Sequence, residues 1–293
     1  VERINPYLVA GATIFIKKRG KPISNLPEMI YGNEPRENGN LFLQPEEKRH
    51  LNLNYPESQN LIKKVTGSYE FINKIERYCL WGDNLLKSEI PLIRERLQKV
   101  RTYRLTSKRK ATQEYSEKPH LFTSITYQKK QSIIIPIVSS ENRVYIPSGF
   151  LDEETVVLNS AQVIYEPEPH IMGIITSMMH MVWMRTLAGR LKSDYRYSSV
   201  LCYNTFPFPQ IPEQKKEEIT QTVFRILEVR EKYSEKTLAQ LYDPDKMPEG
   251  LREAHRQNDE IIEKCYRSKP FESDEERLEH LFKLYEQMIE AEK

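Results

Sequence analysis

The sequence predicts an α+β protein, in which a mixed region of helices and strands is followed by an all-α helical bundle at the C-terminal end. Three observations support this fold class. Short β-type apolar runs alternate with helical patterns as far as residue 210. The proline-rich stretch at residues 206–209 then interrupts the pattern, and only helical periodicity follows it. We therefore expect a domain boundary near residue 211.

The composition argues against a membrane protein. Apolar residues make up 39% and charged residues 29% of the 293 residues. The longest apolar stretch, residues 172–184, is interrupted by Thr176, Ser177 and His180, and it falls short of the roughly 18 residues that a membrane helix needs. It therefore predicts a buried helix, in which His180 packs as a core side chain.

The cysteines and the first residue indicate the setting of the chain. Cys79, Cys202 and Cys265 lie far apart, without the spacing of a zinc site, so we expect reduced core thiols in a cytoplasmic protein. The chain begins at Val1 with no signal peptide, which we interpret as a piece of a longer protein whose missing part lies on the N-terminal side. A processed mature N-terminus is the alternative.

Charge is distributed unevenly along the chain. Residues 1–210 carry 29 basic and 21 acidic side chains, whereas residues 211–293 carry 15 basic and 21 acidic ones. The net charges are thus +8 and −6. A basic body joined to an acidic tail suggests that the body faces a polyanion and that the tail does not.

Residues 1–45 form the first predicted segment, an extended entry segment that follows a preceding domain. Glycines and prolines break it, and short apolar runs predict strands at residues 12–18 and 29–31. The sequence Asn-Gly-Asn at residues 38–40 predicts a turn.

Residues 46–210 form the second predicted segment, a mixed α/β domain. The predicted helices cover residues 45–53, 89–104 and 170–188. Gly189 would end the last of them as a C-cap. β-branched and apolar runs predict the strands, which include a hairpin around residues 159–160. The predicted strands cover residues 75–81, 132–138, 143–146, 155–158, 161–165 and 199–203.

Residues 211–293 form the third predicted segment, a small helical bundle. Ile219, Val223 and Ile226 share one face of its first helix. Ser273 and Glu276 have the spacing of a capping box at the start of the last helix, whose apolar residues repeat at helical intervals. Nothing in this segment resembles catalytic machinery.

Common catalytic motifs are absent from the sequence. Ten glycines are scattered and none forms G-x-G, and there is no P-loop, H-E-x-x-H, G-x-S-x-G or nuclease-type P-D…E-x-K arrangement. The triplet at residues 5–7 (Asn-Pro-Tyr) lacks the second proline of the Asn/Asp-Pro-Pro-Tyr/Phe loop with which amino-methyltransferases hold the target amine. We therefore expect no catalytic residue, no metal site and no cofactor in this chain.

A dense basic run at residues 94–110 is the first sign of nucleic-acid binding. It holds eight cations against one acid, Glu95. Clustered cations of this kind neutralise phosphates, and the alternative is a solvated helix face. The candidate backbone contacts in this run are Arg94, Arg101, Arg104, Lys108, Arg109 and Lys110.

A possible base-reading pair follows at Glu141 and Arg143. The two residues are two positions apart, so on an extended segment they project from the same face. Arginine can donate to guanine O6 and N7 while glutamate accepts from cytosine N4, so one such pair could read both halves of a C·G base pair. Taken by itself, the spacing favours a surface salt bridge.

The segment after the predicted buried helix, residues 189–198, alternates cations with tyrosines. Arg190, Lys192, Tyr195 and Arg196 suit contacts to phosphate and sugar. The alternative is a structural turn that joins helix to strand.

Several blocks in order resemble one protein family. Together they look like the C-terminal part of the MmeI-type restriction–modification proteins and their adenine-specific DNA methyltransferase relatives, and the likeness covers nearly the whole chain. The blocks are INPYLV (4–9), IYGN (30–33), RYCLW (77–81), SSENR (139–143) with YIPSG (145–149), MHMVWMR (179–185), GRLKSDYRYS (189–198), YNTFP (203–207) and LYDPDKMP (241–248).

The resemblance implies a target-recognition domain and a helical C-terminal segment. The catalytic adenine-N6 methyltransferase domain, which uses S-adenosylmethionine, would lie outside this chain, and an endonuclease, where present, would need Mg²⁺. Double-stranded DNA and the methyltransferase domain of the same polypeptide would be the partners. Positions that match Glu141 and Arg143 are similar to specificity determinants of that family, and Tyr145 joins them as a candidate base reader. An interaction scaffold with an acidic tail, and an enzyme in its own right, are the alternatives.

Overall fold

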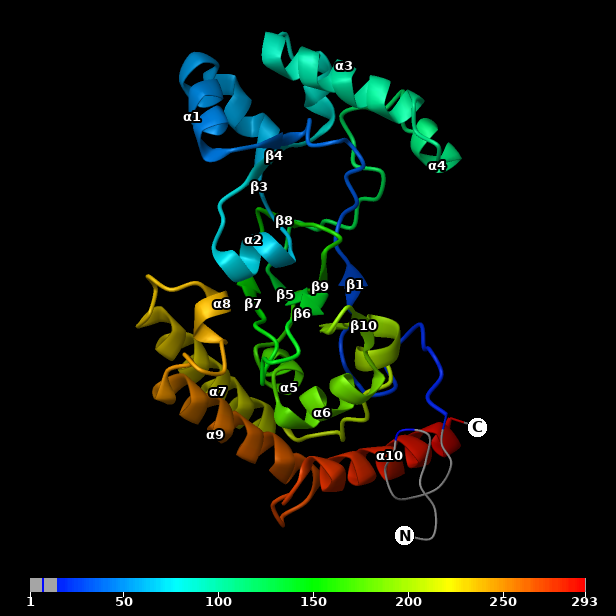
Figure 1. The fold of residues 1–293 in the computed structure, drawn as a ribbon, viewed down its shortest axis with the longest axis vertical. Coiled ribbons are helices and arrows are strands. Elements are labelled where there is room, and N and C mark those ends of the chain that lie inside the picture. Colours follow the sequence, from blue (N-terminus) through cyan, green and yellow to red (C-terminus); the bar gives the residue numbers. More distant parts are fainter. Residues whose placement is uncertain (1–6, 8–14, 293) are drawn as a thin grey trace. The chain divides into compact units, whose positions relative to one another are not determined.

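The computed structural model describes Tyr7 and residues 15–292, which fall into two compact units. Unit 1 comprises Val1–Met29, Ile135–Gly149 and Glu166–Lys293, and unit 2 comprises Ile30–Ile134 and Phe150–Tyr165. Both combine helices with small sheets (Figure 1), so the predicted α+β class is confirmed. These units are a different division from the predicted segments, since helices on both sides of residue 211 pack together in unit 1.

Unit 2 is built on a four-stranded sheet with the order β2-β4-β3-β8, in which β3 and β8 run parallel. Its elements alternate short strands with helices, and the helices predicted at residues 45–53 and 89–104 are among them. They are β2 (Phe42–Leu43), α1 (Pro45–Asn54), the 3-10 helix η1 (Pro56–Leu61), β3 (Ile62–Thr66), α2 (Ser68–Asn73), β4 (Tyr78–Leu80), the 3-10 helix η2 (Asp83–Lys87), α3 (Pro91–Leu105), α4 (Lys110–Gln113) and β8 (Thr155–Val157).

The core of this unit forms where α3 covers the sheet. Ile93 and Val100 are fully buried and Leu97 is nearly so, which confirms the predicted apolar face of this helix. They pack with Leu41 and Leu80 in one cluster of buried side chains. The opposite face of α3 is exposed and carries Arg94, Lys99 and Arg101.

A second sheet, with the order β1-β9-β5-β7, lies mainly in unit 2. The chain approaches it closely at Gly32, where a Cβ atom would stand 2.4 Å from the Leu158 carbonyl oxygen. Asn33 then donates to the Val157 carbonyl from both its backbone and its side-chain amide, at 2.7 Å each. The strands are β1 (Ile30–Tyr31), β5 (Ser132–Pro136), β7 (Gly149–Leu151) and β9 (Ala161–Tyr165).

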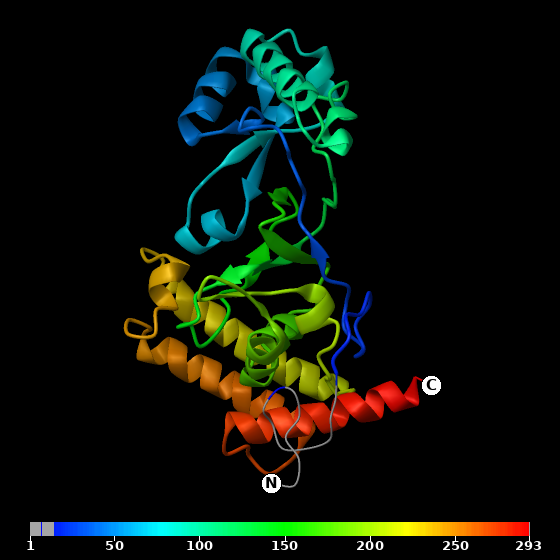
Figure 2. The ribbon, with the colours of Figure 1, turned by 45° about the vertical axis from the view of Figure 1, so that its right-hand side comes forward.

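The described part of unit 1 packs four helices of ten or more residues with one three-stranded sheet, whose order is β10-β11-β6. The helices α7 and α9 run side by side in Figures 1 and 2, and α10 packs on α6 through the rings of Trp183 and Phe282. The elements are β6 (Val138–Ser139), α5 (His170–Ile175), α6 (Met178–Leu187), β10 (Gly189–Leu191), β11 (Asp194–Arg196), the π-helix η3 (Ser199–Tyr203), α7 (Glu213–Glu231), α8 (Leu238–Leu241), α9 (Glu249–Tyr266) and α10 (Asp274–Ala291).

The buried helix predicted at residues 170–188 is two helices. Thr176 and Ser177 separate α5 from α6, because the Ser177 hydroxyl turns to cap the second helix and accepts from the His180 N–H at 3.3 Å. Ala188 is the C-cap of α6, and Gly189 instead begins β10, so the predicted glycine cap is wrong. His180 is fully buried, as expected for a core side chain.

Other predictions about strands are also wrong. The strands at residues 155–158 and 161–165 exist, but β8 and β9 belong to different sheets and form no hairpin, because Asn33 takes the hydrogen bonds between them. Residues 143–146 carry no strand and residues 199–203 form the π-helix η3. Of the strand predicted at residues 12–18, residues 15–18 are not a strand and the rest lie outside the described part.

The C-terminal helices are confirmed as α7, α9 and α10. Ser273 caps α10 by accepting from the Glu276 N–H at 3.2 Å. The Glu276 carboxylate accepts from the Glu272 N–H at 2.7 Å rather than from Ser273, so only half of the predicted capping box forms. Over the described residues, no helix is both long and apolar enough to cross a bilayer.

Candidate nucleic-acid interface

The residues predicted to read a base pair lie in a tight turn at the end of β6. The Arg143 N–H donates to the Ser140 carbonyl at 3.1 Å, which closes a four-residue β-turn. Glu141 and Asn142 form its exposed tip. The extended segment that the sequence analysis assumed is therefore wrong, and the two side chains are presented by a turn instead.

The sheet β10-β11-β6 brings this turn next to the hairpin of β10 and β11. Tyr195 pairs with Ser139 and Arg196 with Val138, so the end of β6 lies beside the strand that carries the predicted phosphate contacts. The Glu141 carboxylate accepts from the Arg190 guanidinium at 3.2 Å. Two signals about 50 residues apart in the sequence thus form one cluster, which we call the 141–196 cluster (Glu141, Arg143, Arg190, Lys192, Tyr195 and Arg196).

Arg190 is held from three sides. Besides Glu141, it donates to the Ser193 carbonyl at 2.7 Å, and its guanidinium carbon lies 4.0 Å from the centre of the Tyr195 ring. Its side chain nevertheless stays about half exposed. A planar cation stacked in this way is pre-ordered at little further entropic cost for a phosphate or a base edge.

Arg143 is the half-buried cation of the cluster. Burial lowers the pKa of its guanidinium, while Asp194 and Asp243 act in the opposite direction and hold its charge. Among the described residues, no hydrogen bond or ion pair engages its guanidinium. Lys192 and Arg196 are exposed, and Lys192 stands at the hairpin tip with a positive φ of 57°.

Tyr145 does not belong to the interface, which corrects its prediction as a base reader. It is 6% exposed, and its hydroxyl donates to the Asp259 carboxylate on α9 at 2.6 Å. Its ring stacks on the His255 imidazole with the ring centres 4.2 Å apart. Burial is the main reason why the pKa of the Tyr145 hydroxyl is raised.

Arg104 is likewise a structural residue rather than a backbone contact. Its side chain is fully buried in unit 2, and all five of its N–H donors reach backbone carbonyls at 2.7–3.1 Å. A guanidinium whose five donors are all engaged in this way ties α3 to the segments on either side of it. The five carbonyls are those of Pro35, Arg36, Tyr115, Lys118 and Leu121.

The remaining cations of the basic run differ in their partners. Arg94 pairs with Glu89, and Arg101 pairs with Glu117 at 2.8 Å, both at the surface. Lys108, Arg109 and Lys110 are exposed at the start of α4, and no described carboxylate pairs with them. These three are the cations of unit 2 best placed to meet a polyanion.

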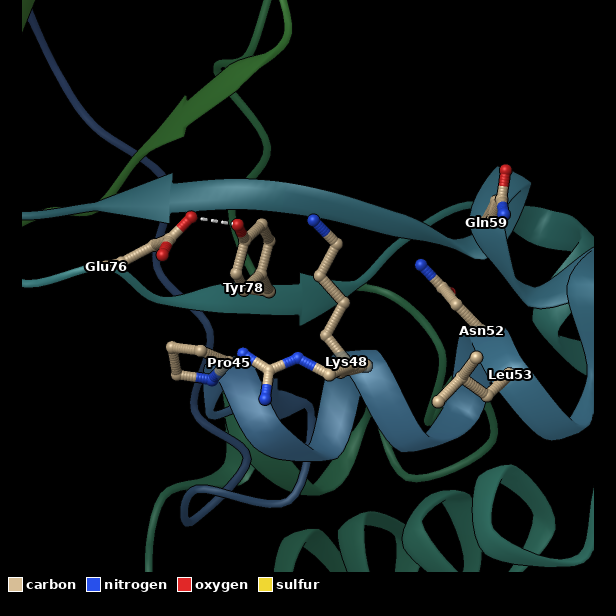
Figure 3. A pocket seen from close by; sticks show the side chains of 8 residues that line it. Pro45, Lys48, Asn52, Leu53, Gln59, Glu76 and Tyr78 are labelled. Atoms are coloured by element: carbon tan, nitrogen blue, oxygen red, sulfur yellow. Dashed lines mark hydrogen bonds between the residues drawn. The ribbon is translucent and has the colours of Figure 1, made fainter.

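A separate open pocket of about 420 Å³ is lined by α1, the 3-10 helix η1 and the β4 segment of unit 2 (Figure 3). Lys48 reaches over the ring of Tyr78, 3.8 Å from its centre, and the hydroxyl of Tyr78 is engaged by Glu76. Asn52 and Gln59 add amide groups to the lining. None of the residues predicted as a site lines it. Within the part of the chain that the structure describes, no cluster of three or more His, Cys, Asp or Glu side chains is arranged to hold a metal ion.

Comparison with known proteins identifies the family. The model of the MmeI target recognition domain matches residues 10–210, and that of the MmeI C-terminal domain matches residues 211–291. The chain belongs to the MmeI family.

Relatives of the MmeI family match nearly the whole chain. DNA methyltransferase A of Bacillus subtilis (strain 168) is 45% identical over 293 residues, which are 99% of this chain and 33% of that protein. The solved structure of the type IIL restriction–modification enzyme MmeI in complex with DNA is 40% identical, covers 99% of this chain and 39% of its own, and gives a TM-score of 0.93. The chain thus spans between a third and two fifths of the length of these relatives.

Sequence reasoning missed the side chains that hold Tyr145. Asp259 and His255 lie on the buried face of α9 together with Leu251 and Ile262. A histidine and an aspartate in register with apolar residues on one helix face are a detectable signal of a buried polar network.

Proposed function

We propose that this chain is the DNA-reading part of an adenine-specific DNA methyltransferase of a restriction–modification system. It would recognise a specific duplex sequence and place the target adenine for flipping into a catalytic domain elsewhere in the same polypeptide. The observation that carries the proposal is the 141–196 cluster, in which an arginine with free donors stands beside a carboxylate and several exposed cations. The match to the MmeI target recognition domain supports it.

Glu141 and Arg143 are the proposed base readers. Arg143 would donate to guanine O6 and N7, and Glu141 would accept from cytosine N4. Glu141 would first have to leave Arg190. That pair is about half exposed, so separating it costs about 1 kcal/mol or less, and a phosphate can replace the carboxylate on Arg190.

The other exposed cations are the proposed backbone contacts. Arg190, Lys192 and Arg196 with Tyr195 would hold phosphates and sugars next to the reading turn. In unit 2, Lys108, Arg109 and Lys110 would add non-specific grip, and Arg94 and Arg101 would contribute if they exchange their surface carboxylates for phosphates.

The chemistry of methyl transfer would come from outside this chain. S-adenosylmethionine would bind the methyltransferase domain of the same polypeptide, and a fused endonuclease, if the gene encodes one, would require Mg²⁺. We further propose that the protein acts in the cytoplasm, where its DNA substrate lies.

Salt-dependent DNA binding tests the proposal. The polypeptide as its gene encodes it should bind a random duplex with an affinity that falls steeply with salt. Replacing Lys108, Arg109 and Lys110 with glutamine should lower the slope of log K against log[salt] by about 2.7, which is about 0.9 for each lost phosphate contact.

A matched control uses three cations that already pair with glutamates on the helical tail. Replacing Arg225, Lys232 and Lys283 with glutamine should leave the slope unchanged. Absence of DNA binding at low salt, or equal slopes for both triple variants, contradicts the proposed backbone role.

A further inference from the structure

The segment at residues 144–148, which directly follows the reading turn, has no regular secondary structure of its own. Its side chains are nevertheless largely buried. Besides one bond within the segment, from the Ser148 N–H to the Ile146 carbonyl at 2.9 Å, it takes its hydrogen bonds from other elements. These bonds come from three helices of unit 1, and they fix the segment at three points.

The first point is a carbonyl next to the turn. Arg185 on α6 donates to the Val144 carbonyl at 2.7 Å. The third point is also a carbonyl, since Arg230 on α7 donates to the Ser148 oxygen at 2.6 Å. Arginine donates two or more bonds in a fixed plane, so each of these contacts sets a direction as well as a distance.

The second point is Tyr145, which α9 holds by ring and hydroxyl. The hydroxyl donates to Oδ2 of Asp259, and Oδ1 of the same carboxyl accepts from the Met178 N–H at 2.6 Å. Asp259 thus joins the reading segment to the start of α6. The His255 ring stacks against Tyr145, and its Nε2 is 2.8 Å from the Tyr242 hydroxyl, which accepts from Arg230.

We propose that Tyr145 and Asp259 are positioning residues through which the C-terminal helices fix the orientation of the base-reading turn. This inference rests on the proposed function and names a part of its machinery. Tyr145 stands two residues after Arg143, so a change in the place of its ring moves the guanidinium directly. Donors that read a base must be held within a few tenths of an ångström. Three anchors from α6, α7 and α9 meet that demand by holding the segment that directly follows the turn.

Tyr145→Phe is the direct test, in the polypeptide as its gene encodes it. It keeps the ring and its stacking and removes the bond to Asp259. The measurement is kcat/KM for methylation of duplexes with the recognised site, divided by kcat/KM for duplexes altered at the base pair that Glu141 and Arg143 read. We expect this ratio to fall about threefold to tenfold, which corresponds to the loss of one hydrogen bond, while the ratios for other positions of the site stay unchanged.

Tyr266→Phe is the matched control. Tyr266 is the last residue of α9, and its hydroxyl donates at 3.0 Å to the Pro207 carbonyl, away from the turn. A purely structural role would make the two variants alike and would alter the rate on all duplexes together. Arg185→Met is a second test. It removes the hydrogen bond to the Val144 carbonyl and should lower the same ratio.

The outcomes separate this inference from the function on which it rests. The inference is overturned if Arg185→Met, together with Tyr145→Phe where that variant folds, keeps the wild-type ratio at that base pair. If exchanging Glu141 and Arg143 leaves the methylated sequence unchanged, the proposed reading function itself fails.

Discussion

Two arginines of one helix show how neighbouring residues of the same type take different tasks. Arg104 is buried in α3 and gives all its donors to the backbone, whereas Arg101 lies one turn earlier at the surface and pairs with Glu117. The sequence displays both as members of one basic run. Only burial separates a residue that holds the fold from one that is free to meet DNA.

Replacing these arginines should therefore have unequal effects on stability. Arg104→Met removes five hydrogen bonds to part-buried backbone carbonyls and should lower the free energy of unfolding by about 3 kcal/mol or more. Arg101→Met removes one exposed ion pair and should cost less than about 1 kcal/mol. Denaturant unfolding of both variants measures this difference, and similar losses would refute the assigned roles.

Asp259 should make stability depend on pH. Burial is the main cause that raises the pKa of its carboxyl to about 7. Since this value lies above that of the unfolded chain, the protonated form is favoured on folding, and the associated stability is present at acidic pH and lost as pH rises from about 4 to 7.

The matched comparison is Asp259→Asn, which cannot ionise. The difference in unfolding free energy between the variant and the wild type should shift in favour of the variant between pH 4.5 and 8, by about 3 kcal/mol. Unfolding curves at both pH values measure it. A difference that is independent of pH would show that this carboxyl has an ordinary pKa.

At the scale of elements, helix faces could be predicted from the sequence and strand partners could not. The apolar periodicity of α3 and α10 determines which side is buried, so α3 was predicted close to its observed bounds and α10 with its observed N-cap, Ser273. The strands β8 and β9 were also located, but β8 pairs with β3 and β9 pairs with β1, both of which lie far away in the sequence. A local pattern carries no information on such a contact.

The contact between α5 and α7 shows how one element limits another. A Cβ atom on Gly173 would lie 2.5 Å from a methyl of Ile219 and 2.8 Å from the side-chain oxygen of Asn258. Gly250, near the start of α9, meets nothing closer than 3.7 Å. The two glycines are thus a matched pair that differ in packing.

Substituting alanine at these two positions should change stability in opposite directions. Gly173→Ala should lower the free energy of unfolding by about 1–3 kcal/mol, because the helices must move apart. Gly250→Ala should raise it by up to about 1 kcal/mol, because alanine favours the helix. Thermal unfolding of the two variants measures both changes in stability, and a stabilising Gly173→Ala would contradict the close packing.

At the scale of the whole molecule, charge and order of motifs indicated the candidate function better than any single residue did. The basic body and the ordered blocks pointed to the MmeI family, which the comparisons show. The individual site residues were harder to predict, since Tyr145 and Arg104 are buried and their polar groups are used within the fold. The sequence also could not show that the turn at residues 140–143 and the hairpin of β10 and β11 share one sheet.

The central claim is that the turn carrying Glu141 and Arg143 reads one base pair of a methylated site. The most direct measurement is to sequence the N6-methyladenine sites that the gene-encoded polypeptide makes in cellular DNA, with and without the double substitution Glu141→Lys and Arg143→Asp. The account predicts that the double variant methylates a sequence that differs at one base pair, with the rest of the site retained. An unchanged methylated sequence at an unchanged rate would contradict it.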